Sequence, residues 1–326
     1  MRCVALLGFA FLLPLAVARA DDKDKGKWVA ISDGVVAKVK AGYPGKTAGV
    51  TVDPSSGDVY MVIPDQGMWK STDKGETFDR VDGKAIGGRC ETGFALNFDP
   101  AGKRLACFMI YGSTASTDDS GKNWTASKVS HLDFGAADWG ATGKCFLAIR
   151  HESGGMLTMT TDTGKTWNDL GKEFVRVGLF DEKILVCGRK KGLVRSDDGG
   201  KTWADVSDVT PPGFVMMVRD DIGYWPTDKG LLVSKDKGKT WDIQGVPVAA
   251  VHGPYWGKKA DHMMVVGKDG FQETTDGGKT WKKAAPLPEG FKAGGVGPNY
   301  AWDSVNDIFY ASSMGKDTFR YQREAK

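Results

Sequence analysis

Cysteine, histidine and long apolar runs are all scarce in this sequence. Its 326 residues include five cysteines and four histidines. No two cysteines form a C-x-x-C pair, and none lies near a histidine at the spacing of a zinc site. We therefore expect no metal centre, and nothing in the sequence indicates a cofactor.

The longest apolar run lies at the start of the chain. It extends from Val4 to Val17, follows Arg2, and is shorter than the roughly 17 to 25 residues of a membrane-spanning helix. Ala18-Arg19-Ala20 then supplies a small-x-small cleavage pattern. The pattern predicts a signal peptide, residues 1–20, cleaved after Ala20, and a secreted or periplasmic mature chain, residues 21–326, with no membrane span.

Charge of one sign is not in excess. The formal net charge of +3 falls to +1 when Arg2 and Arg19 leave with the leader. A near-neutral protein has no electrostatic footprint for nucleic acid, so we expect no nucleic-acid partner. With 41% hydrophobic and 26% charged residues, the chain can form a core, which excludes general disorder.

The cysteines of the mature chain allow two interpretations. They are Cys90, Cys107, Cys145 and Cys187. An exported protein can form disulfides, and four cysteines permit three pairings between which the sequence does not choose. Cys107 and Cys187 lie in apolar, strand-like runs, which is equally typical of buried thiols. Both alternatives stay open at this point.

Glycine and tryptophan are abundant, with 44 and 11 residues, and they mark an internal repeat. Six segments share the pattern Ser/Thr-x-Asp-x-Gly-x-Thr-Trp/Phe, with Asn in place of the second Thr once: 71–78, 117–124, 160–167, 196–203, 234–241 and 274–281. The final aromatic recurs every 36 to 46 residues. A fixed period of this length indicates a repeat architecture.

Each position of the repeat has a structural reason. The aspartate can accept hydrogen bonds from backbone N–H groups downstream, and the glycine can supply the positive φ of a tight turn. The tryptophan can pack its ring against the neighbouring repeat. We therefore interpret the repeated carboxylates as structural rather than catalytic: Asp73, Asp119, Asp162, Asp198, Asp236 and Asp276.

Four short strand-like runs surround each turn, and no segment of the mature chain keeps an apolar period of 3.6 residues. A four-stranded unit repeated about every 40 residues predicts an all-β chain forming a single β-propeller. The tail after the sixth motif has three strand-like runs but no closing turn. Residues 22–28 resemble a degenerate seventh motif, so we predict seven blades, with the N-terminal strand 28–32 completing the C-terminal blade.

These motifs resemble the Asp-box, or BNR-repeat, propellers. The order V-x-x-D-P, V-Y and G-x-W-x-S-T-D-x-G-x-T-F is similar to the photosystem II assembly and stability factor family, to sortilin-type receptors and to xyloglucan-cleaving glycosidases; sialidases share the box. The assembly-factor resemblance implies a non-enzymatic, lumenal or periplasmic protein that binds partner chains, although the arginine-dense patch expected in that family is missing. The xyloglucanase resemblance implies two propellers facing a cleft, and this chain supplies one.

The alternative function is a sialidase-like exo-glycosidase. Sialidases bind a carboxylate with three arginines and use a tyrosine nucleophile. Their first arginine belongs to an R-I/L-P motif before the first box. Here that place reads Val62-Ile63-Pro64, and no arginine occurs between Arg19 and Arg80. Tyr300 is a possible late-blade tyrosine, but we assign no catalytic residue.

Propeller geometry predicts where a ligand binds. If each box joins the third and fourth strands of a blade, the blade connections and the second-to-third-strand loops share the opposite face. We expect a monomer that binds a protein or glycan there. The candidate binding residues are Arg89, Glu91, His131, Asp133, Arg150, His151, Glu152, Arg176 and Arg189, together with His252, Tyr255 and Trp256 of a supposed long insertion.

Overall fold

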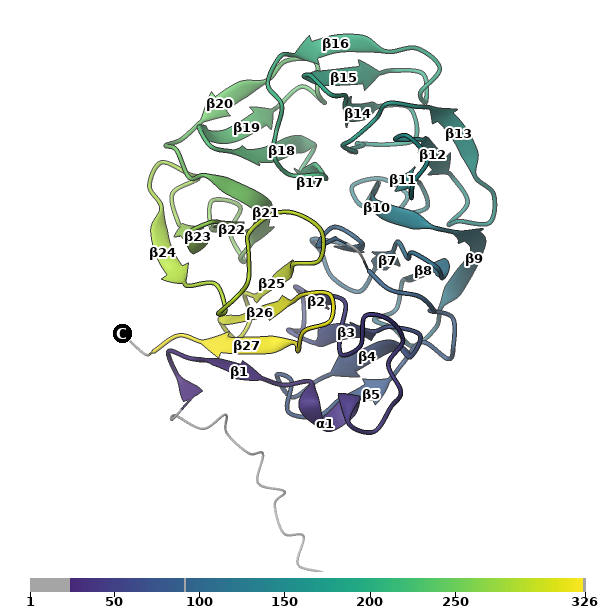
Figure 1. The fold of residues 1–326 in the computed structure, drawn as a ribbon. Helices are drawn as coiled ribbons and strands as arrows, with labels where there is room; N and C mark the ends of the chain where they lie inside the picture. The colour runs from purple at the N-terminus through teal and green to yellow at the C-terminus, as the bar shows by residue number, and fades with distance from the viewer. Residues whose placement is uncertain (1–23, 91, 325–326) are drawn as a thin grey trace, which may run out of the picture.

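The computed structural model describes residues 24–90 and 92–324. The predicted signal peptide, the first residues of the degenerate motif (Asp22 and Lys23) and the candidate Glu91 lie outside the described residues. Within them, seven antiparallel sheets are arranged radially in a ring (Figure 1). The predicted seven-bladed propeller is confirmed.

The blades are numbered in chain order from the first complete sheet, and their strands are given from the centre outward. Blade 1 contains β2 (Val50–Val52), β3 (Val59–Ile63), β4 (Gly67–Ser71) and β5 (Asp79–Arg80). Blade 2 contains β6 (Leu96–Phe98), β7 (Leu105–Cys107), β8 (Ser113–Thr117) and β9 (Thr125–Ser130). Blade 3 contains β10 (Leu132–Ala137), β11 (Phe146–Arg150), β12 (Leu157–Thr160) and β13 (Asn168–Gly171). Blade 4 contains β14 (Leu185–Gly188), β15 (Leu193–Ser196) and β16 (Ala204–Ser207).

Blades 5 to 7 complete the ring. Blade 5 contains β17 (Met217–Arg219), β18 (Ile222–Thr227), β19 (Gly230–Ser234) and β20 (Asp242–Gln244). Blade 6 contains β21 (Ala250–Trp256), β22 (Met263–Gly267), β23 (Gly270–Thr274) and β24 (Lys282–Ala285). Blade 7 contains β25 (Asn299–Asp303), β26 (Ile308–Ser312), β27 (Phe319–Gln322) and β1 (Trp28–Ala30). Antiparallel pairing of β1 with β27 closes the ring as predicted.

Two blades depart from the repeat. In blade 4 the innermost segment makes only isolated bridges, Arg176 to Gly188 and Leu179 to Leu185, so its sheet has three strands rather than four. At the closure, the indole N–H of Trp28 donates to the Pro286 carbonyl at 3.1 Å. In four of the complete boxes the equivalent N–H bonds to the glycine carbonyl of its own turn.

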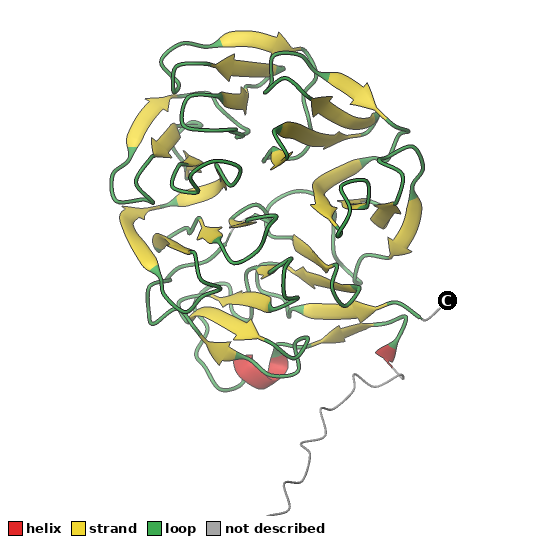
Figure 2. Cartoon of the chain, turned by 180° about the vertical axis from the view of Figure 1, so that it is seen from behind, coloured by secondary structure: helices red, strands yellow, loops and turns green. Residues whose placement is uncertain are grey.

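Helical structure is almost absent, as expected. The one α-helix of the described residues is α1 (Asp33–Val36), which lies beside blade 1 (Figure 2). No helix within the described ranges has the length and apolar character needed to span a membrane.

The core lies between neighbouring blades. Tyr60, Val62 and Met68 of blade 1 share one buried cluster with Leu105 and Cys107 of blade 2. Box tryptophans pack against the edges of such clusters, as predicted: Trp124, Trp167, Trp203, Trp241 and Trp281. All four cysteines of the described chain are buried, and no disulfide joins them, which decides between the two alternatives above.

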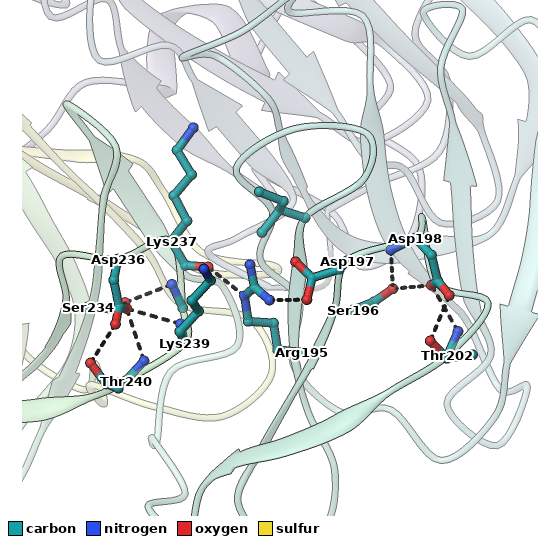
Figure 3. A network of polar contacts seen from close by, with 12 residues as sticks. Arg195, Ser196, Asp197, Asp198, Thr202, Ser234, Asp236, Lys237, Lys239 and Thr240 are labelled. Carbon is teal, nitrogen blue, oxygen red and sulfur yellow. Dashed lines mark hydrogen bonds and ion pairs between the residues drawn. The ribbon is translucent and has the colours of Figure 1, made fainter.

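Each Asp-box is a self-contained hydrogen-bonded turn (Figure 3). The carboxylate of Asp198 accepts from the Ser196 hydroxyl at 2.8 Å, from the Thr202 amide at 2.9 Å and from the Thr202 hydroxyl at 2.6 Å. Gly200, at φ +87, turns its amide onto the Ser196 oxygen at 2.8 Å. Both carboxylate oxygens of Asp198 therefore accept hydrogen bonds within the turn, which supports the structural role predicted for the box aspartates.

These turns predict a loss of stability in acid. Hydrogen bonds from the Thr166 amide and hydroxyl hold the pKa of Asp162 at about 2, and those from Thr280 hold that of Asp276 at about 2. Because the folded-state pKa lies below the unfolded value, this stabilisation is present above about pH 4 and is lost as the pH falls towards 2. Urea midpoints measured from pH 5 to pH 2 should fall, and less steeply for Asp162→Asn. A midpoint that stays constant over this range would contradict the prediction.

Candidate functional site

The strand order divides the ring into two faces. Each innermost strand begins at a blade connection and ends at the turn leading to the second strand. These inner turns lie on the same face as the Asp-boxes, which we call the box face. The blade connections and second-to-third-strand turns lie on the other face, the loop face. As predicted, the six complete boxes each join a third and a fourth strand, when the irregular innermost segment of blade 4 is counted as the first strand of that blade.

Two exposed tyrosines enclose an arginine on the loop face. The guanidinium carbon of Arg89 lies 5.1 Å from the ring centroid of Tyr43 and 4.7 Å from that of Tyr111. These distances fit cation-π contacts. Tyr43 is 72% exposed and Tyr111 is 53% exposed, so both rings are accessible to a partner.

Two histidines extend the same cluster towards blade 3. The His131 ring centroid lies 4.8 Å from that of Tyr111, and the His151 ring centroid lies 5.8 Å from it, both edge to face. His151 Nδ1 is 2.7 Å from Asp133 Oδ1, and its Nε2 is 3.7 Å from Glu152 Oε1. We call Tyr43, Arg89, Tyr111, His131 and His151 the tyrosine-arginine cluster.

The backbone beneath the cluster is strained. Tyr111, His131 and Glu152 have φ values of +58, +63 and +49. Side chains with a Cβ adopt this left-handed region at a cost of about 1–2 kcal/mol each. Positive φ values also occur in turns of other blades, for example at Lys74, Ser120 and Asp307, so this backbone conformation is a general feature of the turns.

The other candidate arginines do not join the cluster. Arg150 pairs with Asp169 at 2.9 Å, and the Arg176 Nε donates to the Pro211 carbonyl. Arg189 lies over the Phe174 ring, 5.3 Å from its centroid. The three guanidinium groups therefore have three separate partners rather than one shared anion site.

The prediction of a loop insertion at residues 251–256 is wrong, because this segment is the inner strand β21. The Gly253-Pro254 pair is typical of a loop, but here it lies within the strand. The strand accommodates it with two bulges, one between Ala250 and His252 and one between His252 and Tyr255. Tyr255 donates to the Tyr300 carbonyl at 2.9 Å, and Trp256 packs on Tyr224 with ring centroids 5.5 Å apart.

His252 belongs instead to an aromatic plug between opposite sides of the ring. Its ring stacks on Phe94 with centroids 4.7 Å apart, and Phe94 contacts Phe214 at 5.8 Å. Phe214 in turn stacks on Phe134 at 5.0 Å. We call Phe94, Phe134, Phe214 and His252 the aromatic plug. Burial lowers the pKa of His252 to about 4, so the ring is neutral at physiological pH.

Tyr43 and Tyr111 are not among the residues predicted from the sequence. Tyr111 lies between β7 and β8, in the second-to-third-strand turn of blade 2, and the face rule applied to every blade would have selected it. Tyr43 lies between α1 and β2, in a segment outside the repeat, so no periodic signal marks it. Within the described ranges no group of three or more His, Cys, Asp or Glu side chains could hold a metal ion.

Comparison with known proteins agrees with the fold. Residues 272–283 match the BNR/Asp-box repeat family. A xyloglucanase from Hypocrea jecorina (strain QM6a) is 25% identical over 241 residues, covering 63% of this chain and 26% of the relative. The chain thus spans about a quarter of the length of that curated relative.

Solved structures give the same result. A GH74 enzyme from Niastella koreensis matches with a TM-score of 0.54 at 14% identity, over 84% of this chain and 52% of that chain. YCF48 bound to a D1 peptide matches with a TM-score of 0.48 at 14% identity, over 91% of this chain and 97% of that chain. The chain is an Asp-box repeat β-propeller, and its structural neighbours include both a glycosidase class and a peptide-binding protein.

Proposed function

We propose that this protein is a non-enzymatic binding module that holds a segment of a partner protein on its loop face. The observation that carries the proposal is the tyrosine-arginine cluster. Tyrosine and arginine are enriched among the residues that dominate binding energy at protein interfaces. Arg89 is positioned between two exposed rings before any partner arrives, so little side-chain entropy is lost on binding.

Two further points favour a protein partner. The cluster combines a cation and aromatic rings with Asp133 and Glu152 at its edge, a mixture typical of a protein interface. In addition, Arg150, Arg176 and Arg189 have separate partners, so these three arginines do not converge on one carboxylate as sialidase arginines do. The signal peptide predicted at residues 1–20 is consistent with a partner met after export.

The test is peptide selection with matched alanine variants. Peptides are selected from a random library on the wild-type protein and measured by isothermal calorimetry. Tyr43→Ala and Tyr111→Ala are each expected to weaken binding by about 30-fold, the equivalent of losing about 2 kcal/mol at a hot spot. Val305→Ala, which removes a 45% exposed side chain on the box face, is the control and should leave affinity unchanged. Peptides that bind all four proteins equally would refute the proposal.

A second candidate is a glycan-directed protein, favoured by the 25% identity with a xyloglucanase. Affinity electrophoresis on xyloglucan and a fluorogenic sialoside assay distinguish it. Our proposal predicts no retardation and no turnover. Sialoside turnover that disappears in Arg89→Ala or Arg176→Ala would replace the binding module with an exo-glycosidase.

A further inference from the structure

We infer that a basic part of the loop face, at blade 4, binds an acidic stretch of the partner segment. It is built from the connection before blade 4, residues 172–176, and from the turn between β14 and β15, residues 188–192. The inference rests on the proposed function and adds the chemistry of the partner to it. These two segments contribute five cations, which we call the basic band: Lys172, Arg176, Arg189, Lys190 and Lys191.

The turn between β14 and β15 presents three of these charges on the loop face (Figure 1). Arg189-Lys190-Lys191 is the only run of three basic residues in the sequence, and all three are exposed. The turn is held on both sides. The Val175 amide donates to the Gly188 carbonyl at 2.9 Å, and the Gly192 amide donates to the Thr210 hydroxyl at 3.0 Å. The backbone that carries the charges is therefore in place before a partner binds, which lowers the entropy cost of binding.

Positive charge is in excess at the basic band. None of its five cations forms an ion pair with a described residue. The two acids nearest in the chain, Glu173 and Asp208, are both exposed.

Arg176 is the least solvated of these cations. It is half-buried, and its Nε donates to the Pro211 carbonyl rather than to a carboxylate. Burial lowers the pKa of this guanidinium, and no carboxylate offsets the effect. A buried charge without a counter-charge costs free energy, so a carboxylate that reaches Arg176 gains more than it would at a fully solvated lysine.

The basic band is continuous with the tyrosine-arginine cluster. His151 of the cluster belongs to the turn 151–156 between β11 and β12. Two carbonyls of this turn accept from the amides of Glu173 and Phe174, both at 3.1 Å. The Arg189 guanidinium lies over the Phe174 ring. One extended partner segment can therefore contact the cluster and the basic band together.

The arrangement fits several carboxylates rather than one. The guanidinium groups of Arg176 and Arg189 have different contacts, so they do not converge on a single anion. Cations distributed along a surface attract an acidic segment by charge complementarity, which speeds association and fixes orientation. We therefore expect Asp and Glu to be enriched in the part of the partner that faces blade 4.

Calorimetry on the selected peptides tests the inference. The variant Lys190→Gln/Lys191→Gln should bind them about tenfold more weakly than wild type, and the loss should shrink between about 50 mM and 300 mM NaCl. The control Lys282→Gln/Lys283→Gln removes two exposed charges from the outer strand of blade 6 and should keep affinity within about twofold. Peptides that require Tyr111 but bind Lys190→Gln/Lys191→Gln as tightly as wild type would overturn the inference and leave the proposed function standing.

Hexaglutamate tests the basic band without a selected peptide. Titrated into the full-length protein, it should change the amide NMR shifts of residues 188–192, whereas hexalysine should not, and the change should be lost in Lys190→Gln/Lys191→Gln. Equal changes at Lys258-Lys259 and Lys282-Lys283 would overturn the inference. Sedimentation of wild type, but not of the variant, with phosphatidylglycerol vesicles would also overturn it, because the band would then bind a membrane. Hexaglutamate binding at 188–192, with selected peptides unaffected by Tyr111→Ala, would support the basic band and refute the proposed function.

Discussion

Replacing Phe94 with alanine is expected to lower the free energy of unfolding by about 3–5 kcal/mol. Phe94 is 7% exposed, and its ring contacts both His252 and Phe214 in the aromatic plug. The change removes a buried ring and leaves a cavity between blades that do not adjoin in the ring. Its neighbours belong to different sheets, so they cannot close the cavity without moving whole blades.

Urea unfolding at pH 7 measures this effect. Phe98→Ala is the matched control, because Phe98 is the last residue of β6, the strand that Phe94 precedes, but is only half-buried and lies outside the plug. Phe98→Ala should lower the free energy of unfolding by less than half as much as Phe94→Ala does. A loss below about 1 kcal/mol for Phe94→Ala would show that the plug does not join opposite sides of the ring.

The second large effect is expected at the junction of the last and first blades. Arg320 is 5% exposed and donates to the Lys74 carbonyl at 2.9 Å and to Glu76 Oε1 at 2.6 Å, both in the first Asp-box. Hydrogen bonds from a charged group contribute about 1.5–3 kcal/mol. Arg320→Met should therefore destabilise the protein by about 2 kcal/mol.

Blade 4 offers an internal comparison for this junction. Arg195 donates to the Lys237 carbonyl of the next box at 2.7 Å and pairs with Asp197 at 2.5 Å (Figure 3). Arg195→Met should have a similar cost, since both arginines bind the carbonyl that follows a box aspartate. Glu76→Gln alone should cost less, because Glu76 is 45% exposed on its side chain. An unchanged denaturant midpoint for Arg320→Met would contradict this account of ring closure.

The sequence was sufficient to predict the blade count and the closing strand, because the Asp-box turn depends on local hydrogen bonds. Within a single turn, Thr202 donates to Asp198 and the Gly200 amide donates to Ser196, so the identities of these residues follow directly from the turn geometry. Because the same turn occurs once in each blade, its residues recur at a regular spacing in the sequence.

The plug and the cluster could not be predicted in this way. Phe94 and His252 meet across the ring, and Tyr43 reaches Arg89 from outside the repeat, so neither contact has a periodic signal. The pair Gly253-Pro254 is typical of a loop, yet bulges in β21 accommodate it within a strand. Of the candidate residues, Arg89, His131 and His151 lie in the cluster, whereas Arg150, Arg176 and Arg189 contact other groups.

The central claim is that the loop face binds the partner. Amide hydrogen exchange, measured with and without a selected peptide, tests this claim most directly. The account predicts slower amide exchange around Tyr111, His131 and His151, with no change in the box-face turns 53–58 and 99–104. Protection confined to those box-face turns, with the amides around Tyr111 unaffected, would contradict it.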